Sequence, residues 1–217
     1  MRIDVVKEIE AVGGYYNDPD LYHFVYKSGK HGCAYLNMDP LFPHVRQMRL
    51  ICDELSYRFA GEFDAVVGAA TGGIPLAAMV ALERHVPIMA WADKVDGGKF
   101  AFERSGFAES LKDRQVLIVE DILNTGDTVR KLIALVRRAG GNVIGVGDAC
   151  NRGDQTARSL EVPRLVSLSK VDLAAYPPDV CPGCQKKLAI VTDIGHGDDF
   201  QKVNPTYEGG YRQLLAA

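Results

Sequence analysis

The residues best suited to chemistry in this chain are two adjacent acids, Glu120 and Asp121, which follow an apolar run. That run, 116–119, contains three β-branched residues and no polar alternation, which is typical of a strand buried on both faces of a parallel sheet. Ionised carboxylates only accept hydrogen bonds, so they suit vicinal hydroxyls or a hydrated cation. We expect both acids at the carboxyl end of a strand, where open α/β sheets bind ligands.

A small polar turn follows the acids and suits a different chemical group. It consists of Asn124, Thr125, Gly126, Asp127 and Thr128. Apolar residues then recur at helical spacing over 129–139, so the turn lies at a helix N-terminus. Free N–H groups and the helix dipole favour an anion there. Hydroxyl-binding acids beside an anion site indicate a ribose 5-phosphate; the alternative is that turn and acids only cap the helix.

The stretch 116–128 resembles the phosphoribosyl diphosphate (PRPP) binding motif of type I phosphoribosyltransferases: an apolar strand, two acids, two variable residues and a Thr- and Gly-rich turn. Three positions differ from the usual motif: Glu120 replaces Asp, Asn124 replaces Thr or Ser, and Asp127 replaces Gly. Asp127 matters most, because a carboxylate repels a phosphate unless its side chain turns away. The resemblance implies that Glu120 and Asp121 hold the ribose hydroxyls, directly or through Mg²⁺, and that the turn holds the 5′-phosphate.

A second strand, small-residue loop and helix occur earlier, over 63–68, 69–73 and 74–83. Small residues let backbone N–H groups approach an anion closely, although a tight turn also needs glycine. In the family the equivalent loop holds the diphosphate, which implies this role for Thr71, Gly72 and Gly73. Many orotate enzymes carry a Tyr-Lys pair where this chain has Ala70-Thr71.

The polar stretch 93–106, with two adjacent glycines, follows the next predicted strand. Long loops inside compact domains are often working lids, and cations on such a flap suit a substrate with several phosphate charges. The alternative is a solvated hairpin. In the orotate enzymes a mobile loop here supplies lysines to the diphosphate, often across a subunit interface. The resemblance implies that Lys94 is a catalytic residue that contacts the diphosphate. Lys99 is the second candidate for this contact, and Arg104 is the third.

Two more cations are candidates. Lys27 lies in a glycine-rich basic turn, and Lys-Ser-Gly there resembles the N-terminal segment of orotate phosphoribosyltransferases, in which the lysine meets the diphosphate. Arg152 follows a predicted buried strand, and arginine is best shaped to grip a carboxylate in bidentate fashion. In the family an arginine at this place contacts orotate. The alternatives are a solvated hairpin for Lys27 and a surface side chain for Arg152.

Cys181 and Cys184 form a Cys-x-x-Cys pair, which is half of a tetrahedral zinc site. We expect any remaining ligands to come from His196, from a partner subunit, or from one of the scattered cysteines. Those cysteines are Cys33, Cys52 and Cys150. A buried thiol pair and a redox pair remain alternatives.

The composition is that of an ordinary globular chain. With 217 residues, 47% of them hydrophobic, it can bury one substantial core. A net charge of −3 gives no reason to expect nucleic acid as a partner. No apolar run approaches the roughly 20 residues of a membrane helix, and the first ten residues do not resemble a signal peptide. Five cysteines, an odd number, favour reduced thiols in the cytoplasm.

The expected fold is α/β, with helices predicted over 4–12 and 43–59 in addition to those above. Strands are predicted over 63–68, 87–92, 116–120, 142–149 and 164–168. The resemblance covers about 22–170 and implies the type I phosphoribosyltransferase fold, a mostly parallel open sheet flanked by helices. It implies a single domain over 1–217, with a core at about 60–170 and a small hood from about 15–42 and 171–217.

The function that the resemblance implies is Mg²⁺-dependent transfer of ribose 5-phosphate from PRPP to a nitrogenous base. Orotate is the favoured base, giving orotidine 5′-monophosphate and diphosphate in pyrimidine biosynthesis. A homodimer is expected. The alternatives are a salvage enzyme for a purine or another base, and a non-enzymatic PRPP-binding regulator.

Overall fold

The computed structural model describes residues 3–59 and 61–215, which form two compact units. The first unit contains the segment ending at Val12 and Met38–Val171, and the second contains Gly13–Asn37 and the segment from Asp172. The second unit starts and ends close to the ranges expected for the hood, except that residues 38–42 belong to the first unit. The reason is that Leu41 is fully buried and its short helix, Asp39–Leu41, contacts α1 and α2. That both units form one domain stays a prediction.

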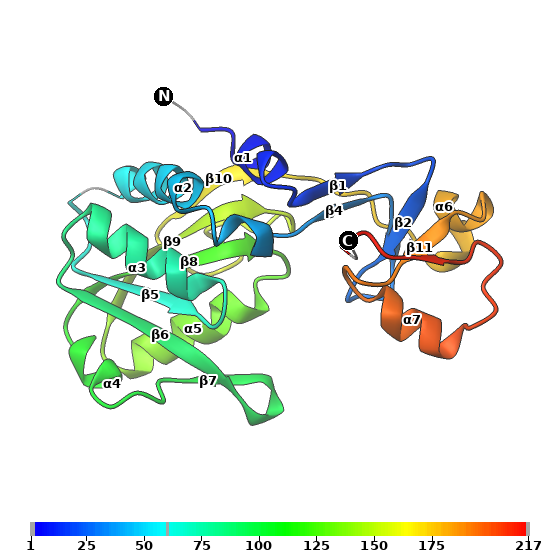
Figure 1. The fold of residues 1–217 in the computed structure, drawn as a ribbon. Coiled ribbons are helices and arrows are strands. Elements are labelled where there is room, and N and C mark those ends of the chain that lie inside the picture. The colour runs from blue at the N-terminus through cyan, green and yellow to red at the C-terminus, as the bar shows by residue number, and fades with distance from the viewer. Residues whose placement is uncertain (1–2, 60, 216–217) are drawn as a thin grey trace. The chain divides into compact units, whose positions relative to one another are not determined.

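The first unit is built on a six-stranded sheet with the strand order β10-β9-β8-β5-β6-β7 (Figure 1). All neighbouring strands are parallel except β6 and β7, which are antiparallel. This confirms the predicted α/β fold with a mostly parallel sheet, and all five predicted strands lie in it. The strands are β5 (Ala65–Ala69), β6 (Ile88–Val95), β7 (Lys99–Ala101), β8 (Gln115–Leu123), β9 (Asn142–Asn151) and β10 (Leu165–Lys170).

Helices cover both faces of this sheet because its strands are apolar on both sides. On one face, Val116 and Ile118 of β8 share a buried cluster with Val129 and Leu132 of α5. On the other face, Gly68 approaches Gly73 of α3 closely, and Gly147 approaches Leu55 of α2. The helices of the unit are α1 (Val5–Ala11), α2 (Val45–Arg58), α3 (Gly73–Glu83), α4 (Phe107–Ser110) and α5 (Asp127–Arg138).

The stretch 93–106 differs from the long polar loop that the sequence predicts. β6 continues to Val95, and β7 pairs back onto it, so that Lys94 lies opposite Phe100. Gly97 and Gly98, both with positive φ, form the tip of this hairpin. The polar composition hid the strand, because a hairpin buried on one side needs few apolar residues; here Phe100 and Phe102 pack against the core.

The second unit contains short elements from both of its segments. β2 pairs in parallel with β11, more than 160 residues later in the chain, and antiparallel with β3. Phe24, Val191 and Ile194 form its small buried cluster. The strands are β1 (Tyr15–Asn17), β2 (Tyr22–Val25), β3 (His31–Gly32), β4 (Ala34–Leu36), β11 (Ala189–Val191) and β12 (Tyr211–Arg212), and the α-helices are α6 (Pro182–Gln185) and α7 (Gly197–Val203). In the described part of the chain, no helix has the length and apolar character needed to cross a membrane.

Candidate functional site

The order of the strands places a crevice between β5 and β8. The chain runs from β5 outward to β6 on one side, and later strands are added on the other side, starting with β8. The loop after β5 therefore leads to α3 on one face, and the loop after β8 leads to α5 on the opposite face. Loops that diverge in this way open a binding crevice at the carboxyl ends of the two strands. Both predicted anion-binding loops lie at this point.

The loop 70–73 lies directly against Asp121. A Cβ atom added to Gly72 would lie 2.2 Å from Oδ2 of Asp121, and one added to Gly68 would lie 2.1 Å from the carbonyl oxygen of Gly73. Both positions therefore need glycine for close approach rather than for backbone conformation. Thr71 is exposed at the rim, and α3 begins at Gly73. The structure thus brings Asp121 together with the three residues predicted to bind diphosphate.

The two acids of the motif point in different directions because side chains alternate along a strand. Asp121 faces Gly72, whereas Glu120 lies on the other face and is only 7% exposed. Glu120 lies beside Asp148 of β9, which is fully buried and accepts a 2.7 Å hydrogen bond from the hydroxyl of Ser167. Asp148 was not among the residues predicted from the sequence, although a single acid inside an otherwise apolar strand indicates a buried carboxyl group.

These buried carboxyls have strongly perturbed acidities. Burial, followed by the charge of Asp121 and a side-chain hydrogen bond with Asp121, holds the pKa of Glu120 well above its usual range, and the charge of Asp148 adds to the effect. Burial raises the pKa of Asp148 to about 7, and the Ser167 hydrogen bond opposes the rise. Within residues 3–59 and 61–215, Glu120 Oε2 and Asp148 Oδ1 are buried without a hydrogen-bond partner. Two unsatisfied carboxyl oxygens at the end of the sheet indicate a site built for a donor or a cation.

The turn 124–128 has the geometry of an anion site. α5 begins at Asp127, so the first N–H groups of this helix have no acceptor within it. The Asp127 carboxylate forms a 2.7 Å ion pair with Lys131, one helical turn later. This ion pair offsets the negative charge of Asp127. It therefore reduces the repulsion of phosphate that is expected where the family motif has Gly and this chain has Asp. Lys131 was missed in the sequence, although the Asp-to-Lys spacing of four residues was visible there.

The loops around this turn are held together by the Arg130 side chain, by a backbone hydrogen bond and by a close contact at a glycine. Arg130 donates hydrogen bonds of 2.7 Å to the carbonyl oxygen of Thr125 and 2.9 Å to Oε1 of Gln155. The backbone N–H of Arg152 donates a 2.8 Å hydrogen bond to the carbonyl oxygen of Leu123. A Cβ atom added to Gly153 would lie 1.6 Å from the carbonyl oxygen of Asn124. Arg152 is half-buried directly after β9, next to the turn, and its role at the base stays a prediction.

The predicted lysines of the flap lie in the β6–β7 hairpin. Residues paired across two strands share a face, so Lys94 lies on the face of Phe100, and Lys99 lies on the face of Val95. Both lysines are exposed and on opposite faces. The hairpin tip is held to α5, because Lys131 donates a 2.8 Å hydrogen bond to the carbonyl oxygen of Gly98. Arg104 lies beyond the hairpin, where its guanidinium stacks 5.9 Å from the Trp91 ring.

The other predicted residues lie in the second unit. Lys27 occupies the exposed turn between β2 and β3, and its role at the diphosphate stays a prediction. Cys181 and Cys184 lie beside two buried histidines, His23 and His31. The expectation that His196 or a scattered cysteine completes this group was wrong. No local pattern pointed to the histidines, because both lie about 150 residues before the cysteines in the chain.

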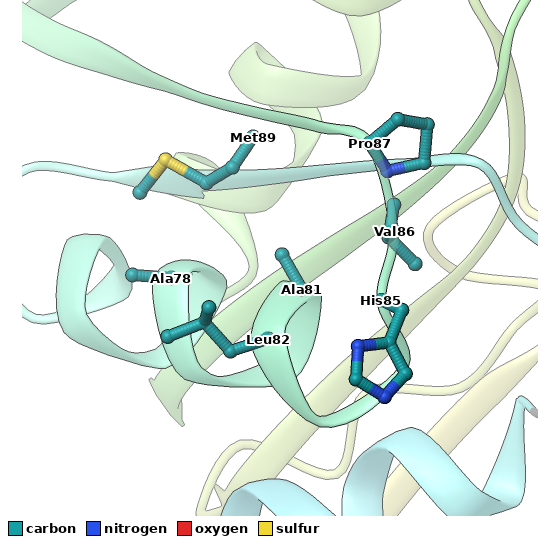
Figure 2. Close-up of a pocket in the computed structure, with 7 residues that line it drawn as sticks. All are labelled: Ala78, Ala81, Leu82, His85, Val86, Pro87 and Met89. Carbon is teal, nitrogen blue, oxygen red and sulfur yellow. The ribbon is translucent and has the colours of Figure 1, made fainter.

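A surface hollow lies elsewhere on the first unit (Figure 2). It is formed by the last turns of α3 and the start of β6, and its lining is almost entirely apolar. The lining residues are Ala78, Ala81, Leu82, His85, Val86, Pro87 and Met89. The lining contains no carboxylate and no glycine-rich loop, so this hollow does not suit the chemistry of the crevice.

The amino-acid sequence of this chain matches a known protein family and its members. The family described as "Phosphoribosyl transferase domain" matches residues 43–178. A protein named orotate phosphoribosyltransferase from Caldanaerobacter subterraneus subsp. tengcongensis is 37% identical over 170 residues, which cover 78% of this chain and 86% of that protein.

Solved structures share the fold. The crystal structure of orotate phosphoribosyltransferase from Aeropyrum pernix matches with a TM-score of 0.58 and 26% identity, covering 77% of this chain and 94% of that one. An adenine phosphoribosyltransferase from Thermoanaerobacter pseudethanolicus has the same TM-score, 0.58, at 19% identity, covering 76% of this chain and 99% of that one. The fold is therefore shared by proteins named for different bases, and the base must be argued from the site.

Proposed function

Because this chain belongs to the phosphoribosyltransferase family, we propose that it transfers ribose 5-phosphate from PRPP to orotate. The observation that carries the proposal is the crevice between β5 and β8. There one glycine-rich loop, a pair of acids and a helix N-terminus converge from opposite faces of the sheet. The products would be orotidine 5′-monophosphate and diphosphate, as in pyrimidine biosynthesis.

The proposed reaction breaks the bond between ribose C1 and a diphosphate oxygen and forms a bond from C1 to a ring nitrogen of the base. Positive charge develops on the ribose as the first bond breaks, as in other displacements at a sugar carbon. The turn 124–128 fixes the 5′-phosphate, and the loop 71–73 receives the diphosphate through backbone N–H groups. Catalysis then depends on positioning and on neutralising the leaving group.

The carboxyl groups at the crevice fit a hydrated Mg²⁺ ion, which prefers oxygen ligands and keeps several waters and substrate phosphates. Asp121 faces the diphosphate loop, and Glu120 has an unsatisfied oxygen. These two residues would hold the ion or the ribose hydroxyls, and the ion would neutralise part of the diphosphate charge. Lys27, Lys94 and Lys99 are the proposed further cations for that group.

A homodimer forms part of the proposal. The β6–β7 hairpin carries Lys94 on one face and Lys99 on the other, so only one of the two lysines can face the crevice of its own chain. In a dimer, the other lysine would reach the diphosphate in the crevice of the partner subunit. The five cysteines are all free, which agrees with the cytoplasmic location we propose.

Orotate is favoured as the base because of Arg152 and the named relatives. The guanidinium at the end of β9 would grip the carboxylate that orotate carries and purines lack. The test is diphosphate release from Mg²⁺-PRPP with orotate, hypoxanthine, guanine or adenine. Turnover with orotate is expected. Turnover only with a purine would indicate a salvage enzyme, and PRPP binding without any turnover would indicate a regulator.

A variant series tests the proposed role of Arg152. Arg152→Ala should lower kcat/KM for orotate by at least about 100-fold, since a charged bidentate pair is worth about 3 kcal/mol when lost, while the Kd for PRPP changes little. Arg158→Ala, an exposed arginine a few residues later, is the matched control and should change neither. Equal losses in orotate use and PRPP affinity would contradict the assignment.

A further inference from the structure

The second unit contains a cluster of metal-binding side chains that the proposed reaction does not use. It consists of His23 on β2, His31 on β3, and Cys181 and Cys184 at the start of α6. One ligand atom from each residue lies within 4.8 Å of the other three. Three of the residues are fully or almost fully buried, and Cys184 is half-buried. Four histidine and cysteine ligands in one buried place are the donor set of a structural zinc site.

The distances within the cluster are close to those of a tetrahedral site. The sulfur of Cys184 lies 3.2 Å from Nδ1 of His31 and 3.4 Å from Nε2 of His23. Zinc bonds of about 2.3 Å to sulfur and 2.0–2.1 Å to nitrogen imply sulfur-to-nitrogen separations of about 3.5 Å across a tetrahedron. The widest separation in such a site is about 3.8 Å, between the two sulfurs. Whichever pair of ligand atoms is the widest, the cluster therefore needs at most about 1.5 Å of contraction to surround an ion.

The local fold brings the cysteines to the histidines without room for another side chain. A Cβ atom added to Gly183 would lie 2.6 Å from Cγ of His23, so the turn between the cysteines rests on the imidazole ring. His31 exchanges two 2.8 Å backbone hydrogen bonds with Tyr176, which fixes the segment that leads into Cys181. The ring of Phe200 lies edge-on to the His31 ring, 5.1 Å away, and closes one side of the cluster.

Hydrogen bonding alone leaves this group poorly satisfied. The thiol of Cys184 can donate to only one of the two imidazole nitrogens that face its sulfur, and among the described residues Nδ1 of His23 and Nε2 of His31 are buried without a hydrogen-bond partner. A disulfide between the cysteines would leave both buried histidines without any role. A divalent cation instead uses one lone pair from each residue, and with two thiolates and two neutral imidazoles the group has zero net charge, as a buried site requires.

We propose that His23, His31, Cys181 and Cys184 bind one zinc ion that holds the second unit together. This unit has a small apolar cluster, and small units are commonly stabilised by a metal. The ligands come from segments about 150 residues apart in the chain, so the ion would close a very long loop. Binding releases two thiol protons, and no oxidant or reductant is required.

The first test is the metal content of the full-length chain purified without chelator. About one zinc per chain is expected by elemental analysis. Replacement by Co²⁺ should give the visible bands of a tetrahedral ion together with sulfur-to-cobalt charge transfer. A chain without zinc that also gives no tetrahedral cobalt spectrum would overturn the proposal. So would oxidised Cys181 and Cys184 in freshly purified protein.

Variants separate this site from nearby thiols and imidazoles. Cys184→Ser and His31→Gln should lower zinc retention against a chelator by at least about tenfold, because even residues that only support a ligand are worth that much. Cys33→Ser and His196→Gln change a cysteine and a histidine outside the group, and both should retain zinc. If a ligand variant does not fold, Co²⁺ titration of the chelated wild-type chain decides the matter. Equal retention in all four variants would refute the assignment.

A third measurement tests the structural role. Zinc removal should increase hydrogen exchange or proteolysis of the segments 22–32 and 176–191, because the ion would join them. The proposed transferase activity is not needed for this readout, so failure of either proposal leaves the other testable. Unchanged protection after complete zinc removal would contradict the structural role.

Discussion

Replacing Asp148 by Asn should make the first unit more stable at neutral and alkaline pH. Burial raises the pKa of Asp148 to about 7, whereas an unfolded chain has the ordinary value near 3.8. Between those values the unfolded chain has lost a proton that the folded chain retains. Unfolding is therefore favoured progressively as the pH rises through this window, and the cost is constant above it.

The size of the effect follows from the two pKa values. A difference of about 3 corresponds to about 4 kcal/mol, of which more than half develops between pH 5 and pH 8. Asn cannot ionise and its amide oxygen can still accept the hydrogen bond from Ser167. The free energy of unfolding of Asp148→Asn, minus that of the wild type, should thus increase by roughly 2 to 3 kcal/mol over this range.

The assay is denaturant unfolding at several pH values without added Mg²⁺ or PRPP. Trp91 is the sole tryptophan and lies on β6, so its fluorescence reports the first unit. Asp154→Asn is the matched control, because Asp154 is exposed and forms only a surface ion pair with Lys170. A difference between Asp148→Asn and wild type that stays constant from pH 5 to pH 8 would refute the reasoning, since Asp148 would then be ionised in the folded chain throughout.

Three other predictions concern the crevice. Gly72→Ala places a Cβ atom 2.2 Å from Oδ2 of Asp121, so it should lower kcat/KM by at least about tenfold, and it should have no further effect in the Asp121→Ala background. Lys131→Met removes the ion pair between Lys131 and Asp127, so KM for PRPP should rise several-fold, and adding Asp127→Asn should reverse most of the rise. Ser167→Ala removes the hydrogen bond that opposes the raised pKa of Asp148, so stability should fall more steeply between pH 5 and pH 8 than in wild type; an unchanged slope would contradict this.

Sequence reasoning succeeded where local pattern and structure have the same cause. The apolar run before Glu120 is continuous because β8 is buried on both faces, and its position between β5 and β9 explains why the acids lie at the crevice. The turn 124–128 was recognisable because the chemistry of a helix N-terminus is local. These features could be predicted from a few neighbouring residues.

Features that depend on distant partners could not be predicted in this way. His23 and His31 lie in short, weakly patterned strands, and only the folded chain shows that they face Cys184. The neighbours of Glu120 were also invisible, because the pairing of β8 with β9 decides that Asp148 lies beside it. At 93–101 the sequence favoured a long loop over the alternative of a hairpin, because its polar residues resemble those of a loop.

The discontinuous second unit has a consequence for synthesis on the ribosome. Its first segment, Gly13–Asn37, emerges early, but its remaining strands lie beyond Val171. At translation rates of about 5–20 residues per second, the nascent segment waits roughly 10 to 30 seconds for its partners. The intervening residues can complete the first unit in that time. Chain termination or cleavage before residue 172 would therefore leave exposed the edge of β2 that pairs with β11, a target for quality-control proteases and chaperones.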